Sequence, residues 1–160
     1  MSDADDLADA VVSFVRCFGL HRPERTSCGF DAGVADAHAL SELDRGPLRQ
    51  MDLVDRLGLA KSTVSRVVAA MVKRGWVSRE ATDSDGRGVV LALTETGSDA
   101  AGRLRVARRH RMEMLLDQVP VGRRRDVVDV LHLLQSAAHA SEETEEHSPS
   151  LATSTQIPDR

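Results

Sequence analysis

The strongest constraint on the fold is a run of two short amphipathic segments and two β-rich segments within residues 50–93. Residues 50–57 and 61–74 each place apolar side chains at helical spacing. Gly58 separates them and Gly75 follows them, and a glycine readily takes the left-handed turn that ends a helix. Two short helices joined by about three residues around a glycine form a helix-turn-helix, so the sequence predicts this motif here.

A β-hairpin is expected directly after the second helix. Residues 76–81 and 89–93 carry the alternating apolar side chains typical of strands, and the stretch between them, TDSDGRG, is rich in turn residues. We expect Trp76 to pack the base of the hairpin onto the core. A hairpin in this place would form a wing beside the helix-turn-helix.

Helices are also expected on both sides of this lobe. Apolar side chains recur at helical spacing within residues 7–18, 31–45 and 95–118, and again after Pro120. Ser, Thr, Glu and Pro dominate residues 141–160, which predicts a disordered acidic tail. The predicted fold is mainly α with a small β-wing, a winged helix-turn-helix lobe joined to a helical dimerisation region.

The prediction divides the chain into four segments: N-terminal helices (1–45), a DNA-binding lobe (46–95), C-terminal helices (96–140) and the tail (141–160). The flanking helices carry apolar stripes that a lobe of this size cannot cover, so we expect a second copy of the chain to cover them. A two-fold pairing would place two recognition helices about 34 Å apart, one turn of DNA. The expected target is a pseudo-palindromic duplex.

Charge is distributed unevenly along the chain. The formal net charge is −4, but residues 1–10 and 141–160 each carry −4, which leaves +4 for residues 11–140. An acidic total therefore does not exclude a nucleic-acid partner. No apolar run approaches the roughly 20 residues that span a bilayer, and the acidic N-terminus lacks the basic start of a secretory signal. We expect a cytoplasmic protein with reduced thiols and no membrane partner.

The second helix of a helix-turn-helix lies in the major groove, and its N-terminal residues reach base edges. Polar side chains gather at that end here. An arginine at the wing tip can enter a narrow minor groove, and other basic residues can contact phosphates. The predicted DNA-contacting residues are Arg49, Lys61, Ser62, Thr63, Ser65, Arg66, Lys73, Arg79 and Arg87, with Asp85 shaping the turn beside Arg87.

These motifs resemble the MarR family (multiple antibiotic resistance regulators). The match runs from "AHALSEL" through "MDLVDRLGLAKSTVSRVVAAMVKRGWVSRE" to "DSDGRGVVLALTETG", residues 37–97. The resemblance implies an obligate homodimer whose terminal helices interlock. The chain departs from the family at Arg49, where Ser or Thr is frequent, and at Gly86 in the wing. The family's recognition-helix, wing and paired acidic positions fall on Ser62, Thr63, Ser65, Arg66, Arg87 and Asp85.

Three kinds of switch are possible, and the first two are a small effector and thiol oxidation. In this family the effector is often a small aromatic acid, and Arg16, His21 and His38 are the candidates to face its cleft. Cys17 and Cys28 are candidates for thiol oxidation, because "Arg-Cys-Phe" around Cys17 is similar to the sensing helix of the peroxide-responsive OhrR branch. In that branch tyrosines form hydrogen bonds with the cysteine. This chain has no tyrosine, so that mechanism cannot carry over intact.

Zinc is the third possible switch, with Glu24, Cys28, His38 and His110 as the available ligands. Their spacing includes no CxxC or HxxxH pair, so the sequence predicts no metal site and no cofactor. No nucleophile–base–acid set or phosphate loop is visible, so an enzyme is not expected.

The predicted function is a sequence-specific DNA-binding transcriptional regulator, a repressor that acts as a homodimer on double-stranded DNA and is released by a small organic effector. Two alternatives stay open. One is a redox- or metal-responsive regulator of the same fold. The other is a winged-helix protein-interaction module that binds no DNA.

Overall fold

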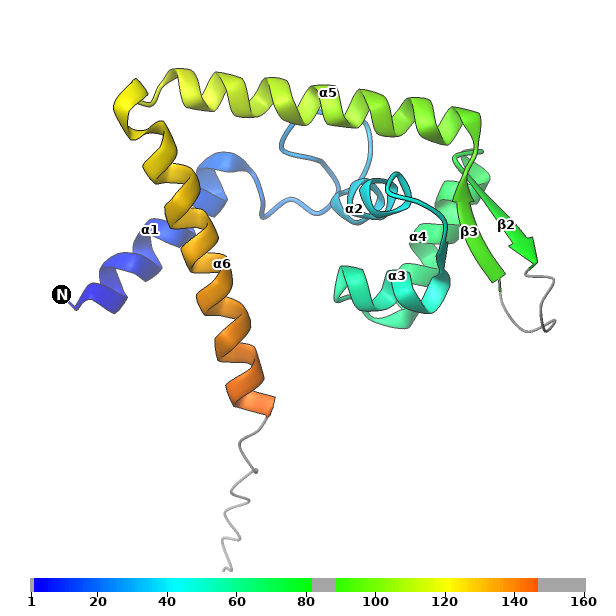
Figure 1. Cartoon of the computed structure of the whole chain (residues 1–160), viewed down its shortest axis with the longest axis horizontal. Helices are drawn as coiled ribbons and strands as arrows, with labels where there is room; N and C mark the ends of the chain where they lie inside the picture. Colours follow the sequence, from blue (N-terminus) through cyan, green and yellow to red (C-terminus); the bar gives the residue numbers. More distant parts are fainter. Residues whose placement is uncertain (1, 82–88, 147–160) are drawn as a thin grey trace, which may run out of the picture. The chain divides into compact units, whose positions relative to one another are not determined.

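The computed structural model of the protein describes residues 2–81 and 89–146, and the chain divides into two units, residues 1–114 and 115–160. The described elements follow one another in this order: α1 (Asp3–Phe18), α2 (Val34–Leu43), β1 (Leu48–Arg49), α3 (Gln50–Leu57), α4 (Lys61–Lys73), β2 (Val77–Ala81), β3 (Val89–Leu93), α5 (Glu95–Asp117), a 3₁₀ helix (Val121–Arg123) and α6 (Arg124–Glu146). Figure 1 shows α2, α3, α4 and the strands gathered near the N-terminal end of α5.

The strands form an antiparallel sheet in the order β1-β3-β2. Val77 of β2 pairs with Leu93 of β3, and Leu48 of β1 pairs with Leu91 of β3. The expected hairpin and the fold class are confirmed: the chain is mainly helical with a small β-wing. Leu91 is fully buried because it lies in the central strand, between both neighbours and the helices.

Glycines end the two helices of the helix-turn-helix as expected. Gly58 has φ of 60° and Gly75 has φ of 71°, a backbone conformation in which a side chain would be strained. The amide of Gly58 donates to the carbonyl oxygen of Val54, and the amide of Gly75 donates to that of Val72. The turn and the start of the hairpin are therefore fixed by backbone geometry.

The core of the lobe is aliphatic, with Trp76 as its one large aromatic side chain. The α4 stripe repeats every three or four residues, so the helix buries one continuous face. Val64, Val68 and Met71 are completely shielded, and Trp76 retains 9% of its exposure, which confirms its expected place at the hairpin base. The buried residues of α4 are Val64, Val67, Val68 and Met71.

Neither α3 nor α4 has a side-chain cap at its N-terminus. Arg49 precedes α3 and Ala60 precedes α4, and neither side chain accepts a hydrogen bond from the first turn. A missing cap costs a helix roughly 1 kcal/mol. Packing of the apolar stripes must therefore supply most of the stability of both helices.

The two terminal helices leave their apolar side chains exposed. No residue of α1 is buried, although Leu7, Val11 and Phe14 form a stripe on it. None of the described side chains of α6 is buried either, and Leu131 retains 52% of its exposure. Both helices thus present apolar surface that this chain, over the residues described, does not cover.

Three boundaries differ from the sequence prediction. The strand β1 was not expected, because two residues carry no local pattern and pair only with the distant β3. Helix α2 begins at Val34 rather than near residue 31, since the amide of Ala32 bonds the carbonyl of Phe30 in a turn before it. Helix α6 begins at Arg124 and continues to Glu146, so residues 141–146 are helical rather than disordered; glutamate is a good helix former.

None of the described helices has the length and apolar character needed to cross a lipid bilayer.

Close packing of α5 on the hairpin base generates a stability prediction. A Cβ added at Gly97 would overlap the backbone carbonyl of Trp76, lying 2.8 Å from its carbon. We expect Gly97→Ala to lower the free energy of unfolding by about 1–3 kcal/mol, as overpacked cores do. Urea unfolding followed by circular dichroism, at matched protein concentration, measures this loss.

Gly102→Ala is the matched control on the same helix. A Cβ there meets only the end of the Arg105 side chain, at 3.8 Å. That variant should gain up to about 1 kcal/mol from helix propensity. Equal stability of the two variants would contradict the close approach at Gly97.

Candidate nucleic-acid interface and effector cavity

The N-terminal half of α4 turns a polar face to solvent. Lys61, Ser62, Ser65 and Arg66 are exposed and Thr63 is half-buried, while Val64 between them is buried in the core. This separation follows from the helical period, which puts apolar and polar side chains on opposite faces. The structure thus brings the five predicted base-reading residues together on one accessible face.

Thr63 and Arg66 interact within this face. A guanidinium nitrogen of Arg66 lies 3.3 Å from the Thr63 hydroxyl oxygen and donates to it. The two residues stand one helical turn apart, so the bond holds the guanidinium close to the helix surface. Arg66 is exposed, so its guanidinium stays accessible to a partner from solvent.

The other predicted phosphate contacts lie on neighbouring elements. Arg49 is on β1, Lys73 ends α4 and Arg79 is on β2, and all three are exposed. Among the described residues, no carboxylate forms a salt bridge with any of them or with Lys61 or Arg66. Asp85 and Arg87, the predicted wing residues, lie outside the described residues.

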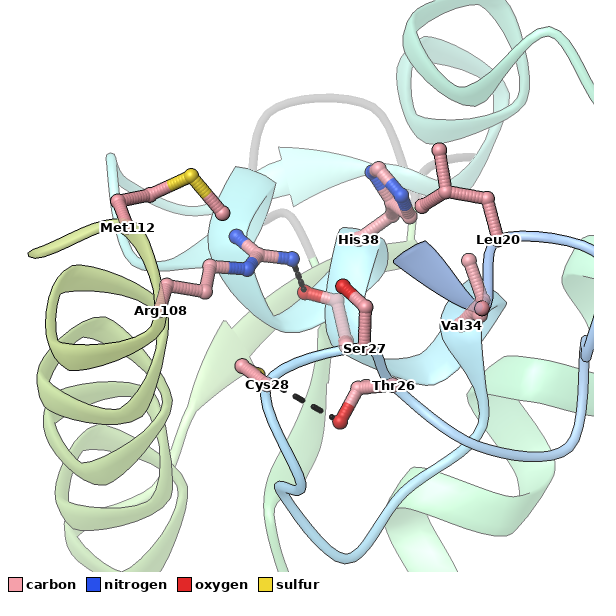
Figure 2. A pocket seen from close by; sticks show the side chains of 10 residues that line it. Leu20, Thr26, Ser27, Cys28, Val34, His38, Arg108 and Met112 are labelled. Carbon is pink, nitrogen blue, oxygen red and sulfur yellow. Dashed lines mark hydrogen bonds between the residues drawn. The ribbon is translucent and has the colours of Figure 1, made fainter. Parts of the chain in front are cut away.

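A cavity of about 370 Å³ lies between α2, α5 and the loop that joins α1 to α2 (Figure 2). His38 comes from α2, Arg108 and Met112 come from α5, and Thr26 and Cys28 come from the loop. Most of the remaining wall is apolar. Its other lining residues are Gly19, Leu20, Ser27, Val34 and Ala37.

Arg108 is the cation of this cavity. Its guanidinium donates to the Ser41 hydroxyl at 2.5 Å and to the carbonyl oxygen of Ala37 at 3.4 Å. Its neighbours Arg105 and Arg109 form salt bridges with Asp44 and Glu113, whereas no described carboxylate pairs with Arg108. No described carboxylate thus neutralises this positive charge beside the cavity.

His38 stands on the wall near this charge. Desolvation of the ring lowers the pKa of His38 below its usual 6.5, although the side chain stays accessible to solvent. The positive charge of Arg108 lowers the pKa further, and the carboxylate of Glu42 opposes both effects. At neutral pH the neutral form of the ring therefore predominates, and this form can donate or accept a hydrogen bond.

Arg16 and His21 lie at a different hollow. That hollow has a volume of about 430 Å³ and is also lined by the valines Val11, Val12 and Val15 of α1. A ring nitrogen of His21 lies 3.5 Å from the carbonyl oxygen of Val15. Of the three predicted effector-binding residues, only His38 lines the cavity that Arg108 faces.

Both cysteines are free thiols. Cys17 is exposed on α1, and Cys28 is half-buried in the cavity wall, where its thiol donates to the Thr26 hydroxyl at 3.5 Å. Within the described ranges, no three His, Cys, Asp or Glu side chains lie close enough together to hold a metal ion.

Comparison with known proteins identifies relatives of this chain. Residues 32–88 match the family model described as the MarR family. An HTH-type transcriptional regulator of Mycobacterium leprae (strain TN), itself uncharacterized, is 26% identical over 117 residues, which cover 72% of this chain and 76% of that protein. Residues 32–88 of this chain are thus similar to the MarR family of transcriptional regulators.

Solved structures of other transcriptional regulators share this fold. The PcaV transcriptional regulator from Streptomyces coelicolor is 22% identical, with a TM-score of 0.63 over 87% of this chain and 99% of that one. A MarR transcriptional regulator from Methanosarcina mazei Go1 is 20% identical, with a TM-score of 0.66 over 84% and 98%. At these identities the likeness shows the fold alone. PcaV has also been solved in complex with its natural ligand.

Sequence reasoning missed Arg108, the cation of the cavity. A signal was present. Ala101, Leu104, Arg108 and Met112 follow one another at steps of three or four residues, so the arginine continues the stripe that α5 buries. A charged residue within an apolar stripe points to a polar task or a partner, and Ser41 is that partner here.

The environment of His38 predicts how its ring titrates. We expect the NMR-detected pKa of His38 to lie below 6.5 and to rise in Arg108→Gln, which removes the nearby positive charge. Arg109→Gln is the control, because Arg109 pairs with Glu113 and does not line the cavity. An unchanged His38 pKa in Arg108→Gln would contradict this placement.

The lowered pKa of His38 also determines how the stability of the protein depends on pH. A histidine whose pKa is lower in the folded state binds fewer protons there than in the unfolded chain. Its contribution to stability is therefore complete above the unfolded pKa and is lost as the pH falls below about 6.5. His38→Gln should make stability less dependent on pH in this window.

Proposed function

We propose that this MarR-family regulator is a repressor that binds a pseudo-palindromic operator as a homodimer and is released by a small effector. The observation that carries the DNA-binding part is the exposed polar face of α4, with Lys61 and Arg66 unpaired by any described carboxylate. Cations of this kind attract phosphates, and serine, threonine and arginine donate to base edges.

The dimer is supported by the apolar surface of the terminal helices. Val127, Leu131, Leu134 and Ala138 follow the spacing of a helix that packs on another helix. In this proposal the DNA-binding lobe is residues 46–95. The two copies are held together, and the effector is enclosed, by residues 1–45 and 96–140. Two-fold symmetry then presents two copies of α4 to successive major grooves.

The effector is supported by the cavity beside Arg108. An apolar wall with one guanidinium and one neutral imidazole suits a small organic molecule that carries a polar or anionic group. The natural ligand bound by PcaV gives a precedent for an effector on this fold. Arg16 and His21 remain candidates to contact an effector at a second place. They line a separate hollow together with valines of α1.

DNA binding is tested with substitutions at the start of α4. We expect Thr63→Ala and Arg66→Ala to cost about 1–3 kcal/mol at the base pair each contacts, and to relax the preference at that position. Fluorescence anisotropy with a duplex from the region upstream of the protein's own gene measures the affinity, and a set of single-base variants of the duplex measures the preference.

Arg125→Gln is the control for this test, because it removes one positive charge from an exposed α6 residue that pairs with Asp129. It should leave both the affinity and the preference unchanged. If no duplex is bound even at low salt, the winged-helix protein-interaction module replaces DNA binding as the function.

The dimer is tested on α6. Leu131→Glu places a charge in the proposed interface and should give a monomer in sedimentation velocity, because a buried unpaired carboxylate is costly. Ser136→Glu adds the same charge on another face of α6, where Ser136 is exposed, and should leave the dimer intact. A dimeric Leu131→Glu protein would exclude this face from the interface.

A further inference from the structure

A short segment of the α1–α2 loop touches both the cavity and the end of the recognition helix. We call residues 26–31 the bridge segment. On one side, Thr26, Ser27 and Cys28 line the cavity, and Figure 2 shows their side chains around it. On the other side, the segment continues without interruption to Phe30, which packs against the core of the lobe.

The contacts at the helix end centre on Trp76. The ring of Phe30 lies 6.1 Å from the ring of Trp76, and the guanidinium of Arg74 lies 4.8 Å from the same ring. Arg74 also donates to the carbonyl oxygen of Asp31 at 3.4 Å. Two residues of the bridge segment thus hold the two residues that flank the glycine after α4.

Hydrogen bonds make the bridge segment a compact unit. The Thr26 hydroxyl donates to the carbonyl oxygen of Phe30 at 2.8 Å and accepts from the Cys28 thiol at 3.5 Å. The amide of Gly29 donates to the carbonyl oxygen of Thr26 at 3.1 Å. If a group in the cavity displaces Cys28, Phe30 should therefore move with it, because both residues belong to the same hydrogen-bonded turn.

Trp76 fixes the direction of α4 relative to its neighbours. Its amide donates to the carbonyl oxygen of Met71 in the last turn of α4, at 2.9 Å, and its carbonyl accepts from Thr94 at 3.0 Å. A helix of this length is about 20 Å long, so a small tilt at the Trp76 end moves the groove-facing end by a larger distance. The contacts of Phe30 and Arg74 thus set where the polar face points.

We propose that the bridge segment couples the cavity to the recognition helix, with Phe30 and Arg74 as positioning residues for α4. The inference rests on the proposed DNA binding of α4. Beside the packing of α2 on α4, this bonded turn is a second connection from the cavity to α4. A group that fills the cavity displaces Cys28, shifts Phe30 on Trp76 and tilts α4. Asp36 faces Arg74 and adds a charge interaction on the α2 side of the same contact.

The test places a larger side chain in the cavity wall. This side chain takes the place of an effector, so the effector need not be known. Cys28→Phe adds a ring where the bridge segment lines the cavity. We expect the dissociation constant for the upstream duplex to rise about tenfold in this variant, within the range of allosteric couplings. In a Phe30→Ala background the same substitution should change the constant less than about twofold.

Two outcomes would overturn the coupling: an equal loss of affinity in both backgrounds, or no loss in either. Cys28→Met replaces Cys28→Phe if circular dichroism shows that the phenylalanine variant does not fold. Phe30→Tyr keeps the ring and should restore the response to bulk at Cys28, which a general loss of stability at position 30 would not explain.

Arg74→Lys separates position from charge. It keeps the positive charge but loses the planar group that lies over Trp76, so the salt dependence of DNA binding should stay the same while the response to Cys28→Phe shrinks. An undiminished response in Arg74→Lys would remove Arg74 from the coupling.

A readout without DNA keeps this inference separate from the proposed function. Trp76 is the only tryptophan of the chain, so its fluorescence reports directly on the contact with Phe30 and Arg74. Cys28→Phe should shift the Trp76 emission, and an identical emission would overturn the coupling. A protein that shows the shift but binds no duplex would refute the DNA-binding function and leave the coupling intact.

Discussion

The arrangement of the lobe depends on the packing around Trp76. Its backbone approaches α5 so closely that only a glycine fits at position 97, and its ring lies between Phe30 and Arg74. The same residue follows the end of α4 and precedes β2, so the backbone of one residue joins the helix, the hairpin and the long helix. The other buried side chains of this core are aliphatic or methionine, so the ring of Trp76 is the one flat, oriented surface among them.

Charge and apolarity are sorted by helical period in this chain. On α4 the period places valines inward and Lys61, Ser65 and Arg66 outward. On α5 the buried stripe continues into the cavity with Arg108, where Ser41 and a backbone carbonyl satisfy the guanidinium. The polar groups to which we assign recognition of DNA and of an effector thus arise from the same helical pattern.

The features that could be predicted from the sequence are those with a local cause. Gly58 and Gly75 indicate where two helices end. The apolar side chains of α4 repeat within one segment, and the apolar residues that alternate within 89–93 indicate a strand. The features that could not be predicted need partners far along the chain. Strand β1 exists because Leu48 meets Leu91, and Arg108 enters the cavity because α5 crosses α2 near Ser41. The bridge segment contains turn residues, but its contact with Trp76 has no signature in the sequence.

The uncapped starts of α3 and α4 have a consequence for how the lobe folds. Each helix is short, and the α4 stripe is rich in valine, which is a poor helix former. Neither would persist as an isolated peptide, because nucleating a helix is unfavourable and these ends offer no local compensation. Each gains its order only when the others are in place. The lobe should therefore open and close as one cooperative unit, with hydrogen exchange of α3, α4 and the hairpin sharing a single protection free energy.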